Sequence, residues 1–255
     1  MRLPKNLRGA TQTGPEPALI VFARAPEPGR VKTRLAPLLG ERGAARLHAL
    51  MVEKTLRTAQ AAGFEGLYLY CAPGTEGEFF KKMQTRFGVR LLTQGRGDLG
   101  DRMFRALRRH SRAILIGSDC PALRPSDLRA AASALRAGAD AVLAPAEDGG
   151  YVLIGLQRVS WRLFEGIPWG GPQVLAQTRR RLEALRWRWR ELRTLWDVDR
   201  PEDVARLRRS RLLRVPLPQG PRVRPICASV RRRAPPSGDS REHSDAPGRT
   251  SARRS

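Results

Sequence analysis

The chain has 255 residues, 41% of them hydrophobic, which is enough to bury the core of one α/β domain. It carries 48 lysines and arginines against 24 acids, a formal net charge of +24 at pH 7. No stretch approaches the roughly 18 apolar residues of a membrane span, and residues 1–13, which we interpret as a flexible arm, contain no apolar core of signal-peptide length. Composition therefore argues against a membrane-spanning protein. The cysteines Cys71, Cys120 and Cys227 show neither metal spacing nor a disulfide framework, which favours a reducing, cytoplasmic location.

Apolar runs and helical spacing alternate along the first two thirds of the chain. Strands are predicted near 18–22, 66–71, 89–93, 113–117, 140–145 and 151–156. Helices are predicted near 41–62, 76–87, 99–110 and 126–137, with further helical patterns near 160–165 and 172–186. The alternating Trp187-Arg188-Trp189-Arg190 segment predicts a strand with one buried face. Such alternation predicts an α/β fold of three layers, in which a mostly parallel sheet is covered on both faces.

The loop after the first strand combines proline and glycine with three cations. A strand-loop-helix junction presents backbone N–H groups and a helix N-terminus to an anion. Arg30, Lys32 and Arg34 alternate, so in an extended segment they would share one side and suit a triphosphate or a nucleotide diphosphate. The alternative is an ordinary basic surface loop in an arginine-rich chain.

An aspartate, Asp119, directly follows the predicted strand 113–117. This is the edge at which open α/β sheets bind ligands, and a short carboxylate suits Mg²⁺ or Mn²⁺ bridging phosphate oxygens. Because Pro121 follows, Asp119 could instead be the N-cap of a helical turn.

Two further acidic segments follow strands. Asp148 precedes two glycines at a junction where backbone can approach a ligand closely, although Asp-Gly is also a plain hairpin turn. Asp197 and Asp199 alternate on an extended segment and would point the same way, as a pair of metal ligands must. In the Pro-Glu-Asp that follows, Glu202 and Asp203 form a normal helix start and are interpreted as structural.

These motifs and their order resemble the GT-A superfamily, the nucleotide-diphospho-sugar transferase fold. Within it the chain is similar to a bacterial family of glycosyltransferase-like proteins, the radical-SAM/selenodomain-associated transferases. The resemblance spans residues 18–207, the expected domain. It rests on the segments 26–35, 94–103, 117–123, 148–151 and 197–203.

The resemblance implies roles for individual residues. Lys32 and Arg34 take the place of the phosphate-contacting cations, which with Asp119 form the expected catalytic set. Asp119 takes the place of the metal-binding acid, and Asp197 or Asp199 that of the second one. The expected cofactor is Mg²⁺ or Mn²⁺. The expected substrate-binding residues are Arg30, Gly95, Gly97, Asp98, Arg102, Asp148, Gly149, Gly150 and Tyr151.

One departure from the superfamily concerns the reaction. The segment 117–123 holds a single aspartate, whereas most GT-A glycosyltransferases have Asp-x-Asp. The expected function is glycosyl transfer from a nucleotide-diphospho-sugar to an unknown acceptor, and nucleotidyl transfer with release of pyrophosphate is the alternative. No specific nucleic-acid partner is expected.

The remaining features of the sequence have structural as well as functional interpretations. Residues 215–255 are rich in arginine and proline and predict a disordered basic tail, and a polyanion-binding protein is the third hypothesis. Covalent catalysis by Cys120 is disfavoured, since no histidine stands near it in the sequence. The histidines His48, His110 and His243 show no partner pattern. Trp161, Phe164 and Trp169 could line an acceptor pocket, but such aromatics are more often core residues. Leu99, Met103 and Leu107 have the spacing of one apolar helix face.

Overall fold

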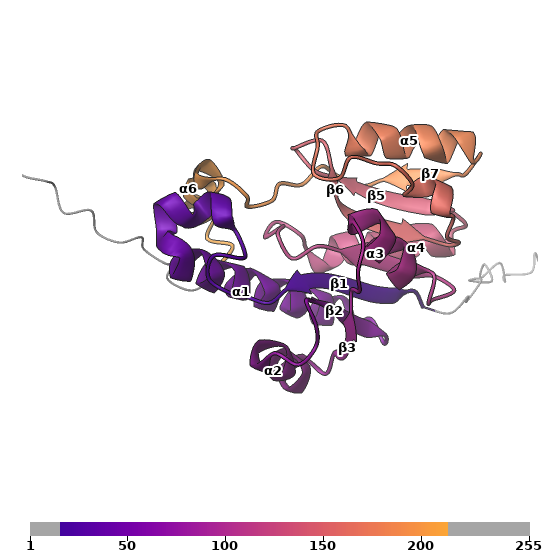
Figure 1. The fold of residues 1–255 in the computed structure, drawn as a ribbon. Helices are drawn as coiled ribbons and strands as arrows, with labels where there is room; N and C mark the ends of the chain where they lie inside the picture. Colours follow the sequence, from indigo (N-terminus) through magenta and orange to yellow (C-terminus); the bar gives the residue numbers. More distant parts are fainter. Residues whose placement is uncertain (1–15, 214–255) are drawn as a thin grey trace, which may run out of the picture. The chain divides into compact units, whose positions relative to one another are not determined.

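The structure, a computed structural model, describes residues 16–213, so the predicted arm (1–13) and tail (215–255) lie outside the described residues. Figure 1 shows the arrangement of the elements. The strands are β1 (Ala18–Arg24), β2 (Leu67–Ala72), β3 (Arg90–Thr93), β4 (Ala113–Ile116), β5 (Ala141–Pro145), β6 (Tyr151–Leu156) and β7 (Trp189–Glu191). The α-helices are α1 (Ala36–Ala62), α2 (Glu78–Phe87), α3 (Leu99–Leu107), α4 (Pro125–Arg136), α5 (Val174–Ala184) and α6 (Pro201–Ser210). Two 3₁₀ helices, η1 (Thr33–Leu35) and η2 (Trp161–Leu163), complete the described elements.

The strands form one sheet of seven in the order β3-β2-β1-β4-β6-β5-β7. All neighbouring pairs are parallel except those made by β6, which is antiparallel to both β4 and β5. The short turn from β5 into β6 forces this reversal, because parallel neighbours need a long crossover. The predicted α/β class and mostly parallel sheet are confirmed.

Alternation along each strand directs side chains to two helical layers. Leu19, Val21 and Ala23 of β1 pack with residues of α1, α2 and α4 on one face. Ile20 and Phe22 pack with residues of α3, η2 and α5 on the other. Burial on both faces explains why the strands contain nearly continuous apolar runs. The sequence prediction of helices on both faces is therefore confirmed.

A third cluster of apolar residues joins the two ends of the described chain. It packs Leu39, Leu47 and Met51 of α1 against Val204 and Leu207 of α6. Trp196 and Val198, from the segment between β7 and α6, lie in the same cluster. The cluster therefore brings the loop before α1 beside the segment before α6, although more than 150 residues separate them in the sequence.

The differences from the predicted boundaries have local causes. The first helix begins at Ala36 rather than at 41, and it is interrupted at Gly40, whose φ of 69° is not helical. Leu99 is 42% exposed rather than on the buried face of α3, because it is the first residue of the helix. Among the described residues, no helix is long and apolar enough to cross a membrane.

Candidate active site

A cavity of about 620 Å³ opens at the carboxyl edge of the sheet. Because β1 and β4 are parallel neighbours, both end at this edge, and the loops that follow them, 25–35 and 117–124, face each other. The chain runs from β1 toward β2 on one side and continues with β4 on the other, and such a reversal of strand order opens a crevice for ligands. The volume is in the range of small-molecule sites.

Ten of the fourteen predicted site residues line this cavity. They come from loops that follow β1, β4, β5 and β7, and from α3 and the start of β6. They are Arg30, Lys32, Arg34, Arg102, Asp119, Asp148, Gly150, Tyr151, Asp197 and Asp199. The other four, Gly95, Gly97, Asp98 and Gly149, are not among the lining residues.

The cationic loop is not extended as the prediction assumed, although Arg30, Lys32 and Arg34 all line the cavity. Lys32 has φ 49° and ψ 40°, a left-handed conformation that non-glycine residues rarely adopt. This bend starts the 3₁₀ turn η1, and the three cations differ in exposure. The side chains of Arg30 and Arg34 are 74% and 67% exposed, whereas that of Lys32 is 6% exposed.

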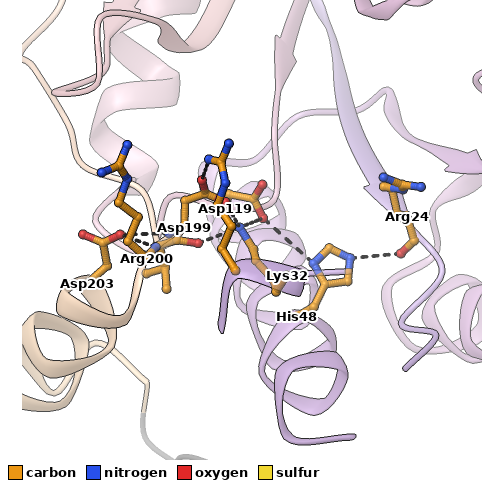
Figure 2. Close-up of polar contacts among 9 residues, drawn as sticks. Arg24, Lys32, His48, Asp119, Asp199, Arg200 and Asp203 are labelled. Atoms are coloured by element: carbon orange, nitrogen blue, oxygen red, sulfur yellow. Dashed lines mark hydrogen bonds and ion pairs between the residues drawn. The ribbon is translucent and has the colours of Figure 1, made fainter. Parts of the chain in front are cut away.

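Lys32 ties together two loops that are distant in the sequence (Figure 2). Its ammonium donates to the carbonyl of Val198 at 2.6 Å and lies 3.0 Å from Asp119 Oδ1 and 4.0 Å from Asp199 Oδ1. The backbone N–H of Val198 also donates to the carbonyl of Asp119 at 2.9 Å. Although burial opposes ionisation, the charge of Lys32 holds the pKa of Asp119 below its usual value. The structure therefore places Lys32 as the centre of the acidic cluster.

The two acids of the 197–199 segment have different partners. Asp199 receives a hydrogen bond from Arg34 at 2.5 Å. Asp197 has a pKa raised to about 6, first by burial and then by the nearby charge of Asp148. Because Val198 between them is fully buried, both acids are directed toward the cavity side of the segment, as their alternation predicts.

Asp119 does not cap a helix in this structure. The following helix, α4, begins at Pro125, and its N-terminus is served by Asp127, whose carboxylate accepts from the backbone N–H of Arg124. Asp127 also accepts two hydrogen bonds from Arg193, at 2.9 and 2.8 Å, and Arg193 donates further to the carbonyl of Ala122. Arg193 thus holds the loop that carries Asp119 against the segment that leads to Asp197.

Three of the four predicted residues that do not line the cavity have a structural role in a helix cap or a turn. Asp98 caps α3, accepting from the N–H of Asp101, whose carboxylate accepts from the N–H of Asp98. Gly97 has φ 95°, and a Cβ there would lie 2.3 Å from the Asp101 carboxylate. Gly149 has φ 88° in the β5–β6 turn, and a Cβ there would lie 2.1 Å from the carbonyl oxygen of Pro172. The hairpin turn weighed for Asp148-Gly149 exists, and Asp148 lines the cavity as well.

The residues of the cavity wall that the sequence analysis missed include two buried polar side chains, His48 and Gln94. His48, from the middle of α1, is 4% exposed and lies 3.9 Å from Asp119 through its Nδ1. Burial lowers the pKa of His48 although the charge of Asp119 opposes the shift. Gln94 is also buried and donates to the carbonyls of Ala23 and Tyr70. A lone histidine within a helical pattern carried no signal of its own.

Trp169, which the sequence analysis considered for an acceptor pocket, lies in the cavity wall. Its indole packs on Gly100, where a Cβ would lie 2.7 Å from Nε1. Phe164 is buried in the core, as the alternative reading predicts. Cys120 lines the cavity, but burial raises the pKa of its thiol to about 11, so the thiolate needed for nucleophilic attack is scarce at neutral pH.

The donor set was compared with what a divalent metal needs. Within residues 16–213, no three His, Cys, Asp or Glu side chains form a group that could hold a metal ion. Mg²⁺ usually takes only one or two carboxylates and completes its shell with phosphate oxygens and water. Asp119 Oδ1 is buried without a hydrogen bond, and the charge on Asp197 is disfavoured beside Asp148. Asp119 and Asp197 therefore fit a metal that arrives with phosphate, whereas Asp199 is occupied by Arg34.

Comparison with known proteins places this geometry in a wider group. Residues 55–171 match a family described as "Uncharacterized protein conserved in bacteria (DUF2064)". The chain is 30% identical to a putative nucleotide-diphospho-sugar transferase from Desulfovibrio desulfuricans G20, whose crystal structure superposes with a TM-score of 0.68. The match covers 76% of this chain and 87% of that protein. A search of curated proteins gave no match.

More distant structures share the fold. One is CMP:2-keto-3-deoxy-manno-octonic acid synthetase complexed with CTP, at 13% identity and a TM-score of 0.51, covering 78% of this chain and 100% of that protein. Another is 4-diphosphocytidyl-2C-methyl-D-erythritol synthase from Anaerococcus prevotii DSM 20548, at 12% identity and a TM-score of 0.52, covering 76% and 96%. At these identities the likeness concerns the fold alone. The predicted GT-A resemblance is confirmed at this level.

Proposed function

The chain belongs to the same family as the putative nucleotide-diphospho-sugar transferase from Desulfovibrio desulfuricans G20 and matches DUF2064 over residues 55–171, and we propose that it is a metal-dependent transferase that moves a glycosyl group from a nucleotide-diphospho-sugar to an acceptor. The observation that carries the proposal is the meeting of cations and carboxylates in one cavity at the carboxyl edge of the sheet. The relative from Desulfovibrio desulfuricans, described as a putative nucleotide-diphospho-sugar transferase, favours the same donor class.

The cavity wall carries charges of both signs, and Arg34 is paired with Asp199. Arg30 and Arg34 follow β1, whereas Asp148 and Asp197 follow β5 and β7. A diphosphate alone would be repelled by the acids, and a divalent cation alone would be repelled by the arginines. A diphosphate with its bound cation suits both sets of charges, because the arginines then face the phosphates and the acids face the cation.

The residues of this chain have distinct roles in the proposal. The exposed guanidinium groups of Arg30 and Arg34 bind the phosphates, with planar donors suited to phosphate oxygens. Lys32 keeps the loops at Asp119 and Val198 in register and adds its charge beneath the phosphates. Asp119 and Asp197 would hold the metal ion, which would supply positive charge for the leaving diphosphate.

The protein need supply no nucleophile for such a transfer. Cys120 is buried with a raised pKa, and the reaction requires only that donor and acceptor be positioned next to one another. Asp148 and Tyr151 at the β5–β6 turn, together with Trp169, line the cavity and would form the part left for the acceptor. The acceptor's attacking hydroxyl would be held there by these side chains.

Nucleotidyl transfer is the second candidate, and a specific observation favours it. Three cations from one loop line the cavity, which matches the larger charge of a triphosphate, and Asp119 stands without the second aspartate of an Asp-x-Asp motif. In that reaction an acceptor phosphate or carboxylate attacks the α-phosphorus and pyrophosphate leaves.

Product analysis separates the two reactions. The protein is incubated with Mg²⁺ or Mn²⁺ and panels of nucleotide sugars and nucleoside triphosphates, with mixed acceptors. Release of a nucleoside diphosphate supports glycosyl transfer, and release of pyrophosphate supports the alternative. Asp119→Asn should lower either release about 10²-fold or more, whereas Glu53→Gln, at an acid paired with Arg57 and Arg86, should not. Absence of nucleotide binding in calorimetry would contradict both.

The predicted organisation of the chain is tested separately. We propose that residues 18–207 suffice for nucleotide binding and that the basic segment 215–255 is an accessory. Deleting 215–255 should leave nucleotide affinity unchanged while weakening retention on heparin. Loss of nucleotide binding on deletion would favour the polyanion-binding hypothesis instead.

A further inference from the structure

His48 is a buried polar residue that the proposed reaction does not yet use. It lies in the middle of α1, directly beneath the carboxyl end of β1, and is only 4% exposed. Its ring lies beside the cluster of Lys32 and Asp119, and it lines the cavity (Figure 2). A polar ring buried at this position needs partners for both of its nitrogens.

One ring nitrogen has a partner that fixes the tautomer. His48 Nε2 lies 3.0 Å from the carbonyl oxygen of Arg24. A carbonyl only accepts, so Nε2 carries the hydrogen and donates it. In the neutral ring the lone pair is then on Nδ1.

The other nitrogen faces an acceptor. His48 Nδ1 is 3.9 Å from Asp119 Oδ1, and both atoms are buried without a hydrogen-bond partner among the described residues. Two lone pairs facing each other in a buried place repel, and His48 Nδ1 lacks the interaction that water would supply. The Lys32 ammonium lies 3.0 Å from the same carboxylate oxygen as an ion pair, but it leaves the His48 lone pair without a partner.

We propose that His48 Nδ1 and Asp119 Oδ1 are ligands of the divalent metal in the proposed transferase. The inference rests on the proposed function, because the nucleotide's phosphates would complete the metal's shell. Metal-binding histidines almost always donate their other ring N–H to a carbonyl or carboxylate, as His48 does to Arg24. The 3.9 Å separation exceeds a hydrogen bond but is within the combined length of two metal-ligand bonds, about 4.2 Å.

An imidazole ligand also predicts which metal is preferred. Mg²⁺ favours an all-oxygen shell, whereas Mn²⁺, Co²⁺ and Zn²⁺ accept a histidine nitrogen readily. Lys32 would keep the Val198 carbonyl and Asp199 as partners when a metal takes Asp119 Oδ1. The site should therefore bind Mn²⁺ more tightly than Mg²⁺, and His48 should account for the difference.

The test measures Mn²⁺ binding to the full-length protein by electron paramagnetic resonance, both with and without a nucleoside diphosphate. His48→Gln retains an amide that can donate toward Arg24 and loses the Nδ1 ligand. The matched control is His110→Gln, at the half-buried histidine that stacks on Tyr68 and does not line the cavity. We expect His48→Gln to weaken Mn²⁺ binding at least about 10-fold, with Mg²⁺ affinity changed less, and His110→Gln to change neither.

A pulsed measurement supplies a readout that a structural role would not move. Bound Mn²⁺ should show nuclear modulation from a directly coordinated nitrogen in the wild type, and His48→Gln should lose it at saturating Mn²⁺. His48→Asn, whose amide can bind a metal only through oxygen, serves as a second variant if His48→Gln fails to fold, and it too should lose the nitrogen modulation. Unchanged Mn²⁺ affinity in His48→Gln, nitrogen modulation that persists in either variant, or no nitrogen modulation in the wild type overturns the proposal.

Nucleotide binding, measured by calorimetry on the same samples, distinguishes this failure from failure of the proposed function. If the wild type binds nucleotide and His48→Gln leaves Mn²⁺ binding unchanged, His48 is not a metal ligand and the transferase proposal stands. If the wild type binds neither nucleotide nor metal, both are wrong.

Discussion

The loop 25–35 and the loop 94–98 offer the same pattern to a reader of the sequence, glycines and charges directly after a strand, yet they differ in the structure. In the first, Lys32 occupies the N-cap position of η1 without a side-chain capping bond, and its ammonium reaches the acids of the cavity. In the second, Asp98 and Asp101 form a capping box for α3. A charge that follows a strand is available for a ligand only when the next helix does not need it as a cap.

The largest expected effect is the loss of turnover when Asp119, in the cavity, is replaced. Asp119→Asn keeps the size of the side chain and removes its charge, so we expect turnover to fall about 10²-fold or more, the scale of lost electrostatic stabilisation. The fold should persist, because the backbone bond from Val198 to the Asp119 carbonyl remains. Initial rates and a thermal melt check both parts. Turnover close to that of the wild type would contradict the role of Asp119.

Asp127 tests how the loop that carries Asp119 is held in place. Burial opposes its ionisation, but the hydrogen bonds of Arg193 outweigh burial and hold the pKa of Asp127 below its usual value. Such a carboxylate stabilises the fold above its unfolded pKa of 3.8, and the stabilisation is lost as pH falls below that value through the lower folded pKa. We expect Asp127→Asn to lower the free energy of unfolding by about 2 kcal/mol at pH 7. Urea titrations should show the gap between wild type and variant shrinking below pH 3.8; a gap that stays constant would contradict the assignment.

Arg34 tests whether an exposed cation of the first loop binds phosphate. Its side chain is 67% exposed and is held toward the cavity by Asp199. We expect Arg34→Gln to raise the KM for the nucleotide donor about 10-fold, the loss of one charge-assisted contact, with little change in melting temperature. Arg42→Gln, an exposed arginine on α1, is the control. Equal effects of the two variants would indicate that only overall charge matters.

The smallest effect is expected on the capping side. Asp98→Ala removes the N-cap of α3 and should lower the free energy of unfolding by about 1 kcal/mol, whereas Asp98→Asn should retain most of it. Donor KM should stay unchanged in Asp98→Asn. A large rise in KM in Asp98→Asn would indicate that the loop 94–98 binds substrate, as the resemblance implies.

Most of the fold could be predicted from the sequence because its signals are local. Continuous apolar runs marked the buried strands, and the helix of Glu202 and Asp203 was identified from its proline and acids, of which Asp203 caps it in the structure. The site was harder to predict because its geometry depends on distant contacts. Alternation alone could not show that Lys32 turns left-handed, since that conformation is stabilised by Val198 and Asp119. Nor could any local pattern place His48 beside Asp119, 71 residues further along the chain.

The contact between Lys32 and the Val198 carbonyl spans 166 positions, so it bears on when the site comes into being. A chain emerging from the ribosome displays its cationic loop early, but the acceptors that neutralise Lys32 arrive only with residues 119 and 198. Contacts of such long range form slowly and late, because closing a long loop costs entropy. A nucleotide that binds only the finished cavity therefore selects chains folded as far as α6, and its presence during refolding should raise the yield of complete molecules over fragments.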